Sequence, residues 1–477
     1  MPIRFGTSGL RGLAVELMGV ASIIYTKAFC HHLEETGLAR KGDTILIGQD
    51  LRESSPAIAR NCIKAIRACG FKPVDCGLLP TPALACYAMF TGAAAVMVTG
   101  SHIPSERNGI KFYLLDGEIA KHDEISISCW AEKLEGCTGA DAAEAEDAHQ
   151  LACEAFLNRM KALLPDAALT GMRIGVYQHS SVARDLLIDI LRHYGAEVVA
   201  LGRSSTFVPI DTEAVSEETV GLLMDWAGQG LDAIVSADGD ADRPLVADEA
   251  GNLLRGDLIG LMTAEFLGAR VVVTPETSNS GIEKIGSFEV IRTRVGSPYV
   301  IAGMLEALAA SKGGVIGFEA NGGFLTATSF APAGKEVSAL PTRDCFLPIL
   351  SVLYMAAKSG KTLSGLANAY RLPVANADRI EGYALERSAA LMEHLRGSED
   401  NLSAFLAGIG RVIGKSDIDG LRVYLDNGRT IHFRPSGNAP EMRCYVEAED
   451  KAAARSMLRK GLRLIEAFTL GENDREP

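Results

Sequence analysis

Residues 238–243 place three aspartates at alternating positions directly after an apolar stretch. The segment reads D-G-D-A-D-R. Carboxylate oxygens are the ligands that hard divalent cations prefer in proteins. Without a cation or a basic partner, three carboxylates so close together would repel one another. The pattern therefore predicts that Asp238, Asp240 and Asp242 bind a metal ion.

Two other kinds of site share part of this pattern. A calcium EF-hand loop has the same aspartate spacing, and Glu249 falls on its last ligand position. However, Arg243 stands where that loop needs glycine for its sharp turn, and the flanks read as strands. A phosphatase of the haloacid-dehalogenase type also places D-x-D after an apolar strand, but it would carry Thr or Val in place of Asp242. Both alternatives are disfavoured by these residues.

A second loop, residues 99–111, reads T-G-S-H-I-P-S-E-R-N-G-I-K and follows an apolar run. In α/β sheets, ligands bind at the carboxyl ends of strands, so Ser101 is expected to be accessible at such an end. Gly100 is expected to permit an unusual backbone angle and a close ligand approach. His102 and Lys111 are candidates for proton transfer or anion binding. The alternative is an ordinary polar turn rich in Ser, Gly, Asn and Pro.

A third loop, residues 434–443, reads R-P-S-G-N-A-P-E-M-R. Arginine offers a rigid fork of donors that suits phosphate. Hydroxyl, amide and backbone N–H groups after it could complete an anion nest. The alternative is a Pro/Gly turn with a solvated arginine. The candidate anion-binding residues are Arg434, Ser436, Gly437, Asn438 and Arg443.

Alternating strand and helix patterns position the first two loops. Residues 43–48 and 93–98 read as buried strands, and a helix is predicted from about residue 55 to residue 70. Ser55 is the expected N-cap of that helix, and Pro56 suits its first turn. Strands alternating with helices are typical of α/β architecture.

The last part of the chain has a different pattern. The sequence D-N-G at 426–428, which is typical of a β-hairpin turn, lies between two strand-like runs. A helix is predicted over 451–468. We therefore expect three similar α/β domains and a smaller α+β domain. The predicted boundaries give domains over residues 1–150, 151–253, 254–371 and 372–477.

The composition excludes several classes of protein. The 477 residues are 47% hydrophobic, and the net charge is −13, which does not suit binding to nucleic acid. No apolar run approaches the roughly 20 residues of a membrane span, and the start of the chain has no apolar signal region. The ten cysteines form no C-x-x-C pair, which fits a reducing compartment. We expect a cytoplasmic protein that binds neither nucleic acid nor membranes.

Taken together and in this order, the loops resemble those of the α-D-phosphohexomutase superfamily. Four further segments resemble its motifs: T-S-G-L-R-G at 7–12, G-Q-D-L-R-E-S-S at 48–55, L-P-T-P at 79–82 and T-R-V-G at 293–296. The resemblance spans nearly the whole chain. It implies four domains around a central cleft.

The resemblance also implies roles for individual residues. Ser101 would carry the phosphoryl group, and its oxygen would join Asp238, Asp240 and Asp242 in binding Mg²⁺. Lys111 and His102 would assist proton transfer, and Arg11 and Arg243 would lie in the cleft. Arg434, Ser436, Gly437, Asn438 and Arg443 would bind the phosphate that is not transferred.

The sugar-binding loop departs from the superfamily pattern G-E-x-S-G-H. Residues 317–324 read G-F-E-A-N-G-G-F. Glu319 matches, and its carboxylate can accept hydrogen bonds from two sugar hydroxyls. Asn321 replaces the serine and Gly323 the histidine, which puts the preferred sugar in doubt.

Within the superfamily, the motif sequences are most similar to those of bacterial phosphomannomutases. This implies interconversion of mannose 1-phosphate and mannose 6-phosphate, with a hexose 1,6-bisphosphate as intermediate and activator. Glucose and glucosamine phosphates are alternative substrates in the same class. A sugar phosphatase and a non-catalytic sugar-phosphate-binding protein are alternatives in other classes. The expected partners are hexose phosphates, and the chain is expected to be a monomer or a homodimer.

Overall fold

The computed structural model describes residues 3–6, 8–134, 144–436 and 440–468. The chain divides into two compact units. The first unit comprises Met1–Val273 and Gly296–Ala369, and the second comprises Thr274–Val295 and Tyr370–Pro477. Each unit is therefore built from two separate stretches of chain.

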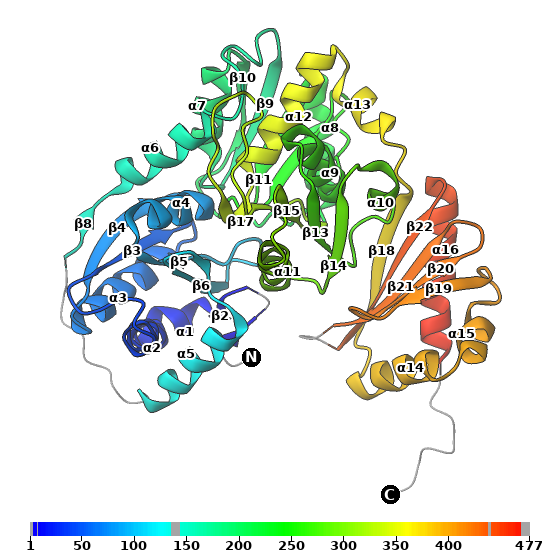
Figure 1. Ribbon diagram of the computed structural model, residues 1–477, viewed down its shortest axis with the longest axis horizontal. Helices are drawn as coiled ribbons and strands as arrows, with labels where there is room; N and C mark the ends of the chain where they lie inside the picture. The colour runs from blue at the N-terminus through cyan, green and yellow to red at the C-terminus, as the bar shows by residue number, and fades with distance from the viewer. Residues whose placement is uncertain (1–2, 7, 135–143, 437–439, 469–477) are drawn as a thin grey trace, which may run out of the picture. The chain divides into compact units, whose positions relative to one another are not determined.

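The first unit begins with an eight-stranded sheet (Figure 1). Its order is β1-β2-β6-β5-β3-β4-β8, and β7 pairs with β6. The central strands β4, β3 and β5 are parallel, whereas β6 pairs with β5 in the antiparallel sense. The strands are β1 (Arg4–Phe5), β2 (Leu10–Leu13), β3 (Thr44–Gln49), β4 (Lys72–Leu78), β5 (Ala94–Val98), β6 (Arg107–Leu114), β7 (Gly117–Glu118) and β8 (Glu146–Asp147).

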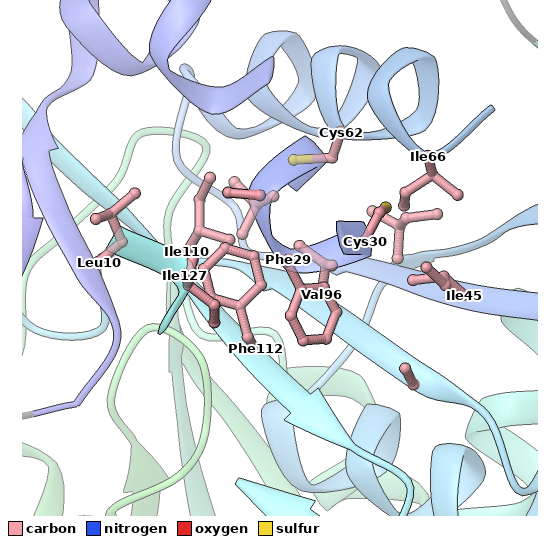
Figure 2. Packing of buried hydrophobic residues seen from close by; sticks show 14 of the residues in the cluster. Leu10, Phe29, Cys30, Ile45, Cys62, Ile66, Val96, Ile110, Phe112 and Ile127 are labelled. Atoms are coloured by element: carbon pink, nitrogen blue, oxygen red, sulfur yellow. The ribbon is translucent and has the colours of Figure 1, made fainter. Parts of the chain in front are cut away.

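Helices lie on both sides of this sheet, with α2 and α4 on opposite sides (Figure 1). Figure 2 shows the core under α2, α3 and α5, where the rings of Phe29 and Phe112 have centroids 4.8 Å apart. Ile45 and Val96 belong to the same cluster, so the strand that leads to Ser101 is anchored in packed apolar side chains. The helices are α1 (Ala14–Glu16), a π-helical turn (Leu17–Ala21), α2 (Ser22–Glu35), α3 (Ser55–Ala68), α4 (Thr81–Thr91), α5 (Lys121–Lys133) and α6 (His149–Met160).

The second sheet has the order β10-β9-β11-β12. β9 is parallel to both β10 and β11, and β12 pairs with β11 in the antiparallel sense. Its elements are β9 (Arg173–His179), α7 (Arg184–His193), β10 (Glu197–Arg203), α8 (Glu217–Ala227), β11 (Ala233–Ala237) and β12 (Pro244–Ala247).

The third sheet repeats this plan. Within the first unit its order is β13-β15-β16-β17, with β13 and β15 parallel and β16 antiparallel to both of its neighbours. The elements are α9 (Gly256–Leu267), β13 (Val271–Pro275), α11 (Ser297–Ala309), β15 (Val315–Phe318), β16 (Phe324–Thr326), β17 (Leu340–Asp344), α12 (Phe346–Ser359) and α13 (Leu363–Ala369).

All three sheets carry a candidate functional loop at the same place. Each loop connects a parallel strand to its antiparallel neighbour: β5 to β6, β11 to β12, and β15 to β16. The first contains Ser101, the second the three aspartates, and the third Glu319. A repeated α/β plan thus presents three chemically different loops at equivalent strand ends, which confirms the predicted fold class.

The second unit contains an antiparallel sheet of the order β18-β22-β21-β20-β19. The predicted D-N-G hairpin is confirmed, because β20 and β21 pair and Gly428 donates its N–H to the carbonyl of Leu425 at 3.0 Å. The elements are α10 (Ile282–Ile285), β14 (Glu289–Thr293), β18 (Val374–Glu381), α14 (Leu385–Gly397), α15 (Glu399–Leu406), β19 (Val412–Ser416), β20 (Leu421–Leu425), β21 (Thr430–Pro435), β22 (Glu441–Ala448) and α16 (Lys451–Ala467).

Two local expectations were wrong. Ser55 is not an N-cap but the first residue of α3, and its hydroxyl donates to Oδ1 of Asp50 at 2.5 Å. Gly100 does not adopt the unusual backbone angle, which lies at Ser101, where φ is +54°. None of the described helices combines the length and apolarity needed to cross a membrane.

Candidate active site

Ser101 lies directly beyond β5, with its side chain buried. Its φ of +54° is in the left-handed region, which a residue with a Cβ adopts only when its surroundings require it. The backbone N–H of Ser101 donates to the hydroxyl of Thr99 at 2.8 Å. Ser101 is therefore fixed in a strained turn at the strand end, and this turn defines the direction of its Oγ.

The side chain of Arg52 fixes this turn through hydrogen bonds to its backbone. Its guanidinium donates to the carbonyl oxygens of Ser101, Ile103, Pro104 and Arg107 at 2.5–3.0 Å. A Cβ on Gly100 would lie 2.5 Å from Cζ of Arg52. The glycine is therefore needed for the close approach of an arginine of the chain itself.

The three aspartates of the loop between β11 and β12 lie beside Ser101 and are buried. One carboxylate oxygen from each can be chosen so that all three lie within 4.8 Å of one another. Ala241, between two of the aspartates, has a φ of +62°. A Cβ on Gly239 would lie 2.7 Å from the carbonyl oxygen of Ser101. The loop thus packs tightly against the serine turn.

In each aspartate, one carboxylate oxygen accepts hydrogen bonds from two protein groups. Oδ1 of Asp238 accepts the backbone N–H groups of residues 242 and 243. Oδ2 of Asp240 accepts from Thr81 and Lys111, both at 2.6 Å. Oδ2 of Asp242 accepts from Lys111 at 2.6 Å and from Arg343 at 2.7 Å.

The second oxygen of each carboxylate has a different environment. Oδ2 of Asp238 accepts from the hydroxyl of Ser101 at 2.5 Å. Within the described residues, Oδ1 of Asp240 and Oδ1 of Asp242 are buried and have no hydrogen-bond partner. Buried carboxylate oxygens without donors are costly unless a cation is present. Oxygen ligands of this kind suit a hard divalent cation, so the residues fit the expected metal site.

Burial and charge set the protonation states in this cluster. Burial, followed by the neighbouring Asp242 and Asp240, raises the pKa of Asp238 well above its ordinary value. Burial also acts to raise the pKa of Asp242, but Arg343 and Lys111 outweigh it and hold that pKa far below its usual range. For Lys111, burial acts to lower the pKa, but Asp240 and Asp242 raise it above its ordinary value. Lys111 is therefore a firmly protonated cation at neutral pH.

His102, Arg11 and Arg243 border the same cluster. Nδ1 of His102 lies 3.2 Å from Oγ of Ser101, and burial, followed by Arg243, lowers the pKa of His102 to about 3. The imidazole is therefore neutral at pH 7. Arg11 donates to the carbonyl of Thr99 at 2.6 Å, and burial lowers its pKa to about 10. Nε of Arg243 lies 3.6 Å from Oδ1 of Asp242.

Glu319, in the loop between β15 and β16, is linked to the aspartates by the side chain of Arg343. Glu319 is buried, and its Oε2 accepts from Nη1 of Arg343 at 3.1 Å. Oδ1 of Asn321 accepts the backbone N–H of Gly323 at 2.9 Å, which shapes the turn. Arg343 thus joins Glu319, the candidate sugar-binding residue, to the loop of the three aspartates.

In the second unit, Arg434 and Arg443 lie directly opposite each other on β21 and β22. Like charges in this position repel unless an anion or acidic residues compensate. Nε of Arg434 lies 2.9 Å from Oδ2 of Asp419, and Nη2 of Arg443 donates to Glu441 at 3.2 Å. Ser436 donates its backbone N–H to the carbonyl of Glu441 at 2.9 Å. Gly437 and Asn438 lie outside the described residues.

Comparison with known proteins supports the resemblance. Models of the phosphoglucomutase/phosphomannomutase family match three stretches: alpha/beta/alpha domain I over residues 2–133, alpha/beta/alpha domain III over 255–372 and the C-terminal domain over 375–460. The chain belongs to this family. It is therefore a phosphotransferase enzyme of the mutase type.

Two relatives within this family are similar over nearly their whole length. A phosphomannomutase from Sinorhizobium fredii is 52% identical over 466 residues, covering 97% of this chain and 98% of the relative. A phosphomannomutase from Salmonella muenchen is 40% identical, covering 95% and 93%. The crystal structure of a family protein from Burkholderia thailandensis shares the fold, with a TM-score of 0.74 at 19% identity, covering 97% of both chains.

Four residues of the cluster were missed as site residues in the sequence. Asp50 belongs to the cluster because its Oδ2 accepts from the hydroxyl of Thr99 at 2.8 Å. Asp50, Arg52 and Thr81 lie in segments that resemble family motifs, so the motif itself was the available signal. Arg343 lies within the short strand β17 and has no motif around it. Its position between two buried carboxylates becomes visible only when the second and third sheets are placed together.

Proposed function

We propose that the chain is a phosphomannomutase that interconverts mannose 1-phosphate and mannose 6-phosphate through a phosphorylated Ser101. The observation that carries the proposal is the 2.5 Å hydrogen bond from the Ser101 hydroxyl to Asp238, within a cluster of three buried carboxylates. The 52% identical relative named as a phosphomannomutase supports the choice of sugar.

The proposed reaction has two phosphoryl transfers, the first from Ser101 to the substrate and the second from the resulting bisphosphate back to Ser101. In the first transfer, the bond between phosphorus and Oγ of Ser101 breaks, and a bond to the free hydroxyl of the hexose monophosphate forms. In the second transfer, the other phosphate of the resulting hexose 1,6-bisphosphate returns to Ser101. The bisphosphate must turn round between the two transfers, and added bisphosphate would act as an activator by phosphorylating Ser101.

Positioning is the main task of the protein in such a reaction, because phosphoryl transfer requires alignment and charge compensation more than covalent chemistry. Arg52 and the positive φ of Ser101 serve the alignment. Asp238, Asp240 and Asp242, with Oγ of Ser101 or its phosphate, would hold Mg²⁺. When bound, Mg²⁺ would offset the charge on the transferring group.

Lys111 and His102 have protonation states suited to different tasks. The raised pKa of Lys111 keeps its side chain protonated, so its main role would be that of a cation that offsets negative charge near the reacting oxygen. The imidazole of His102 is neutral, and its Nδ1 lies 3.2 Å from Oγ of Ser101, so it would form a hydrogen bond with the reacting oxygen. A pKa of about 3 makes it a weak base for the assistance to proton transfer that the resemblance implies. Arg11 and Arg243 would add positive charge around the phosphoryl group.

The remaining site residues would bind the rest of the substrate. We assign the sugar hydroxyls to Glu319, with Asn321 shaping its loop. The phosphate that is not transferred would bind to Arg434, Arg443, Ser436, Gly437 and Asn438. The cross-strand pair of arginines supports this assignment, because two guanidinium groups on neighbouring strands can donate to the same phosphate.

We propose four domains over residues 1–150, 151–253, 254–371 and 372–477, a cytoplasmic location, and a monomer or a homodimer. The partners would be hexose phosphates only, without nucleic acid or membrane.

The test is ³¹P NMR of the purified protein with Mg²⁺ and a trace of hexose 1,6-bisphosphate. The 1-phosphates of mannose, glucose and glucosamine are supplied separately. We expect the mannose 6-phosphate signal to grow fastest at the expense of its 1-phosphate. Faster conversion of glucose or glucosamine phosphate would change the assigned sugar, and release of inorganic phosphate would point to a phosphatase. No change with any sugar would refute the proposed activity.

A further inference from the structure

Gly323 stands where the superfamily's sugar loop carries histidine, and the structure shows what fills the space. A Cβ added to Gly323 would lie 2.5 Å from Cδ and 2.9 Å from Cγ of Arg343. Distances under 3 Å require one of the two groups to move. The side chain of Arg343 therefore occupies the path that any side chain at position 323 would take.

Arg343 cannot easily give way, because both ends of its guanidinium are held. Nη2 donates to Oδ2 of Asp242 at 2.7 Å, and Nη1 donates to Oε2 of Glu319 at 3.1 Å. Arg343 is 3% exposed, and both carboxylates are buried as well. Breaking a buried ion pair on one side leaves an uncompensated charge, so displacement is costly.

The bridge uses only one oxygen of Glu319. Arg343 contacts Glu319 through Oε2, and Oε1 lies outside this bridge. A guanidinium presents donors in a fixed planar fork, so the two contacts define the orientation of both carboxylates at once. The second oxygen of Glu319 is therefore available to a ligand while the first is fixed.

We propose that Arg343 is a positioning residue for sugar recognition, which links Glu319 to the metal-binding loop and takes the space of the missing histidine. This inference rests on the proposed function. Arg343 sets where Oε1 of Glu319 meets the sugar hydroxyls, and Gly323 is required because a larger residue would displace Arg343. The pair thus explains why this loop lacks histidine.

The first test is a double-mutant cycle of R343K and E319Q. Lysine keeps the positive charge but cannot hold two carboxylates in separate directions. We expect R343K and E319Q each to raise the KM for mannose 1-phosphate about 10-fold, and R343K to have less than about a 3-fold effect in the E319Q background. The affinity for mannose 6-phosphate, measured calorimetrically without divalent metal, should follow the same pattern. Independent, multiplicative effects of the two substitutions would overturn the proposal.

The second test does not depend on the stability of R343K. Gly323→Ala should displace Arg343, raise KM about 10-fold, and lower Tm by about 4 °C. Gly221→Ala, in α8 with nothing within 4 Å of the added Cβ, is the matched control; it should leave KM unchanged and should not lower Tm, because alanine favours the helix more than glycine does. An unchanged KM in G323A would overturn the proposal. Wild-type protein without mutase activity on any sugar would instead refute the proposed function, so the two failures are distinguishable.

Discussion

The hydroxyl of Ser101 donates a 2.5 Å hydrogen bond to Oδ2 of Asp238, across a separation of 137 residues in the sequence. Ser101 comes from the first sheet and Asp238 from the second. The proposed phosphoryl carrier is therefore defined by the packing of two sheets, and each of its contacts can be tested separately.

Ser101→Ala should lower kcat by about 10³-fold or more, because the substitution removes the only atom to which the phosphoryl group can return. Alanine keeps the Cβ, so the backbone turn should persist. Turnover and intact mass after incubation with hexose 1,6-bisphosphate measure the effect, and the variant should gain no phosphate. The exposed Ser105, four residues further on, provides the control: Ser105→Ala should behave like the wild type. Normal turnover in S101A would remove Ser101 from the mechanism.

Asp240→Asn should weaken Mg²⁺ binding on the order of 10- to 100-fold, since an amide oxygen replaces a buried carboxylate oxygen that has no other partner. Isothermal calorimetry of the phosphate-free protein measures this affinity. Asp225→Asn, on the exposed side of α8, is the control for the loss of one negative charge. Equal Mg²⁺ affinity in D240N and D225N would contradict the assigned metal site.

Mg²⁺ affinity should fall as the pH falls. Burial and the adjacent carboxylates raise the pKa of Asp238 well above its ordinary value, so a proton competes with the metal for this carboxylate. Metal binding below the raised pKa must release that proton, and binding above it need not. Calorimetric titrations in two buffers with different ionisation enthalpies would count the protons released. Affinity that is constant across the acidic range would contradict the raised pKa.

Arg52→Met should lower kcat about 10²-fold with little change in KM, because four carbonyl oxygens of the serine turn lose their donor and Ser101 moves out of alignment. Amide hydrogen exchange over residues 101–107 should accelerate in the same variant. Arg60→Met, on an exposed position of α3, is the matched control. Unchanged exchange in this segment would show that Arg52 does not hold the turn.

His432 should make the second unit less stable in acid. Burial lowers the pKa of His432 to about 4, against 6.5 for an ordinary histidine. Between these values the unfolded chain binds a proton that the folded unit does not, so stability falls as the pH decreases from about 6.5 to about 4. The shift corresponds to about 3 kcal/mol at most.

His432→Gln should flatten this dependence, since glutamine can still donate to the carbonyl of Asp419 but does not titrate. Denaturant unfolding at a series of pH values measures the effect. His122→Gln, at a side chain that is 83% exposed, should leave the dependence unchanged. An identical pH profile for H432Q and the wild type would contradict the lowered pKa.

Much of the first unit could be predicted from local patterns. The apolar run before Ser101 is β5, and the run before Asp238 contains β11, because continuous β-branched and apolar residues can only be buried in a sheet covered on both faces. The spacing alone predicted that the carboxylates of Asp238, Asp240 and Asp242 lie close together, as they do in the structure. Ser55 was misjudged, because its hydroxyl serves the distant Asp50 rather than its own helix.

The partners of the carboxylates could not be predicted. Thr81, Lys111 and Arg343 reach the same loop from three different parts of the chain. Spacing along a sequence records neighbours on one helix or strand, whereas these contacts depend on how the sheets pack. Arg343 is the clearest example, since nothing near it in the sequence distinguishes it from a surface arginine.

The division of the second unit into two stretches of chain has a consequence for its synthesis. Segment 274–295 leaves the ribosome before its partners, among them Arg422, which donates to the carbonyl of Glu276, and Asp419, which accepts the N–H of Val295. The intervening residues 296–369 belong to the first unit and must be translated in the meantime. Because domains fold as units, this early segment must wait as a nascent chain without its partners. Segment 274–295 therefore gains these partners only when the last sheet of the chain has been translated.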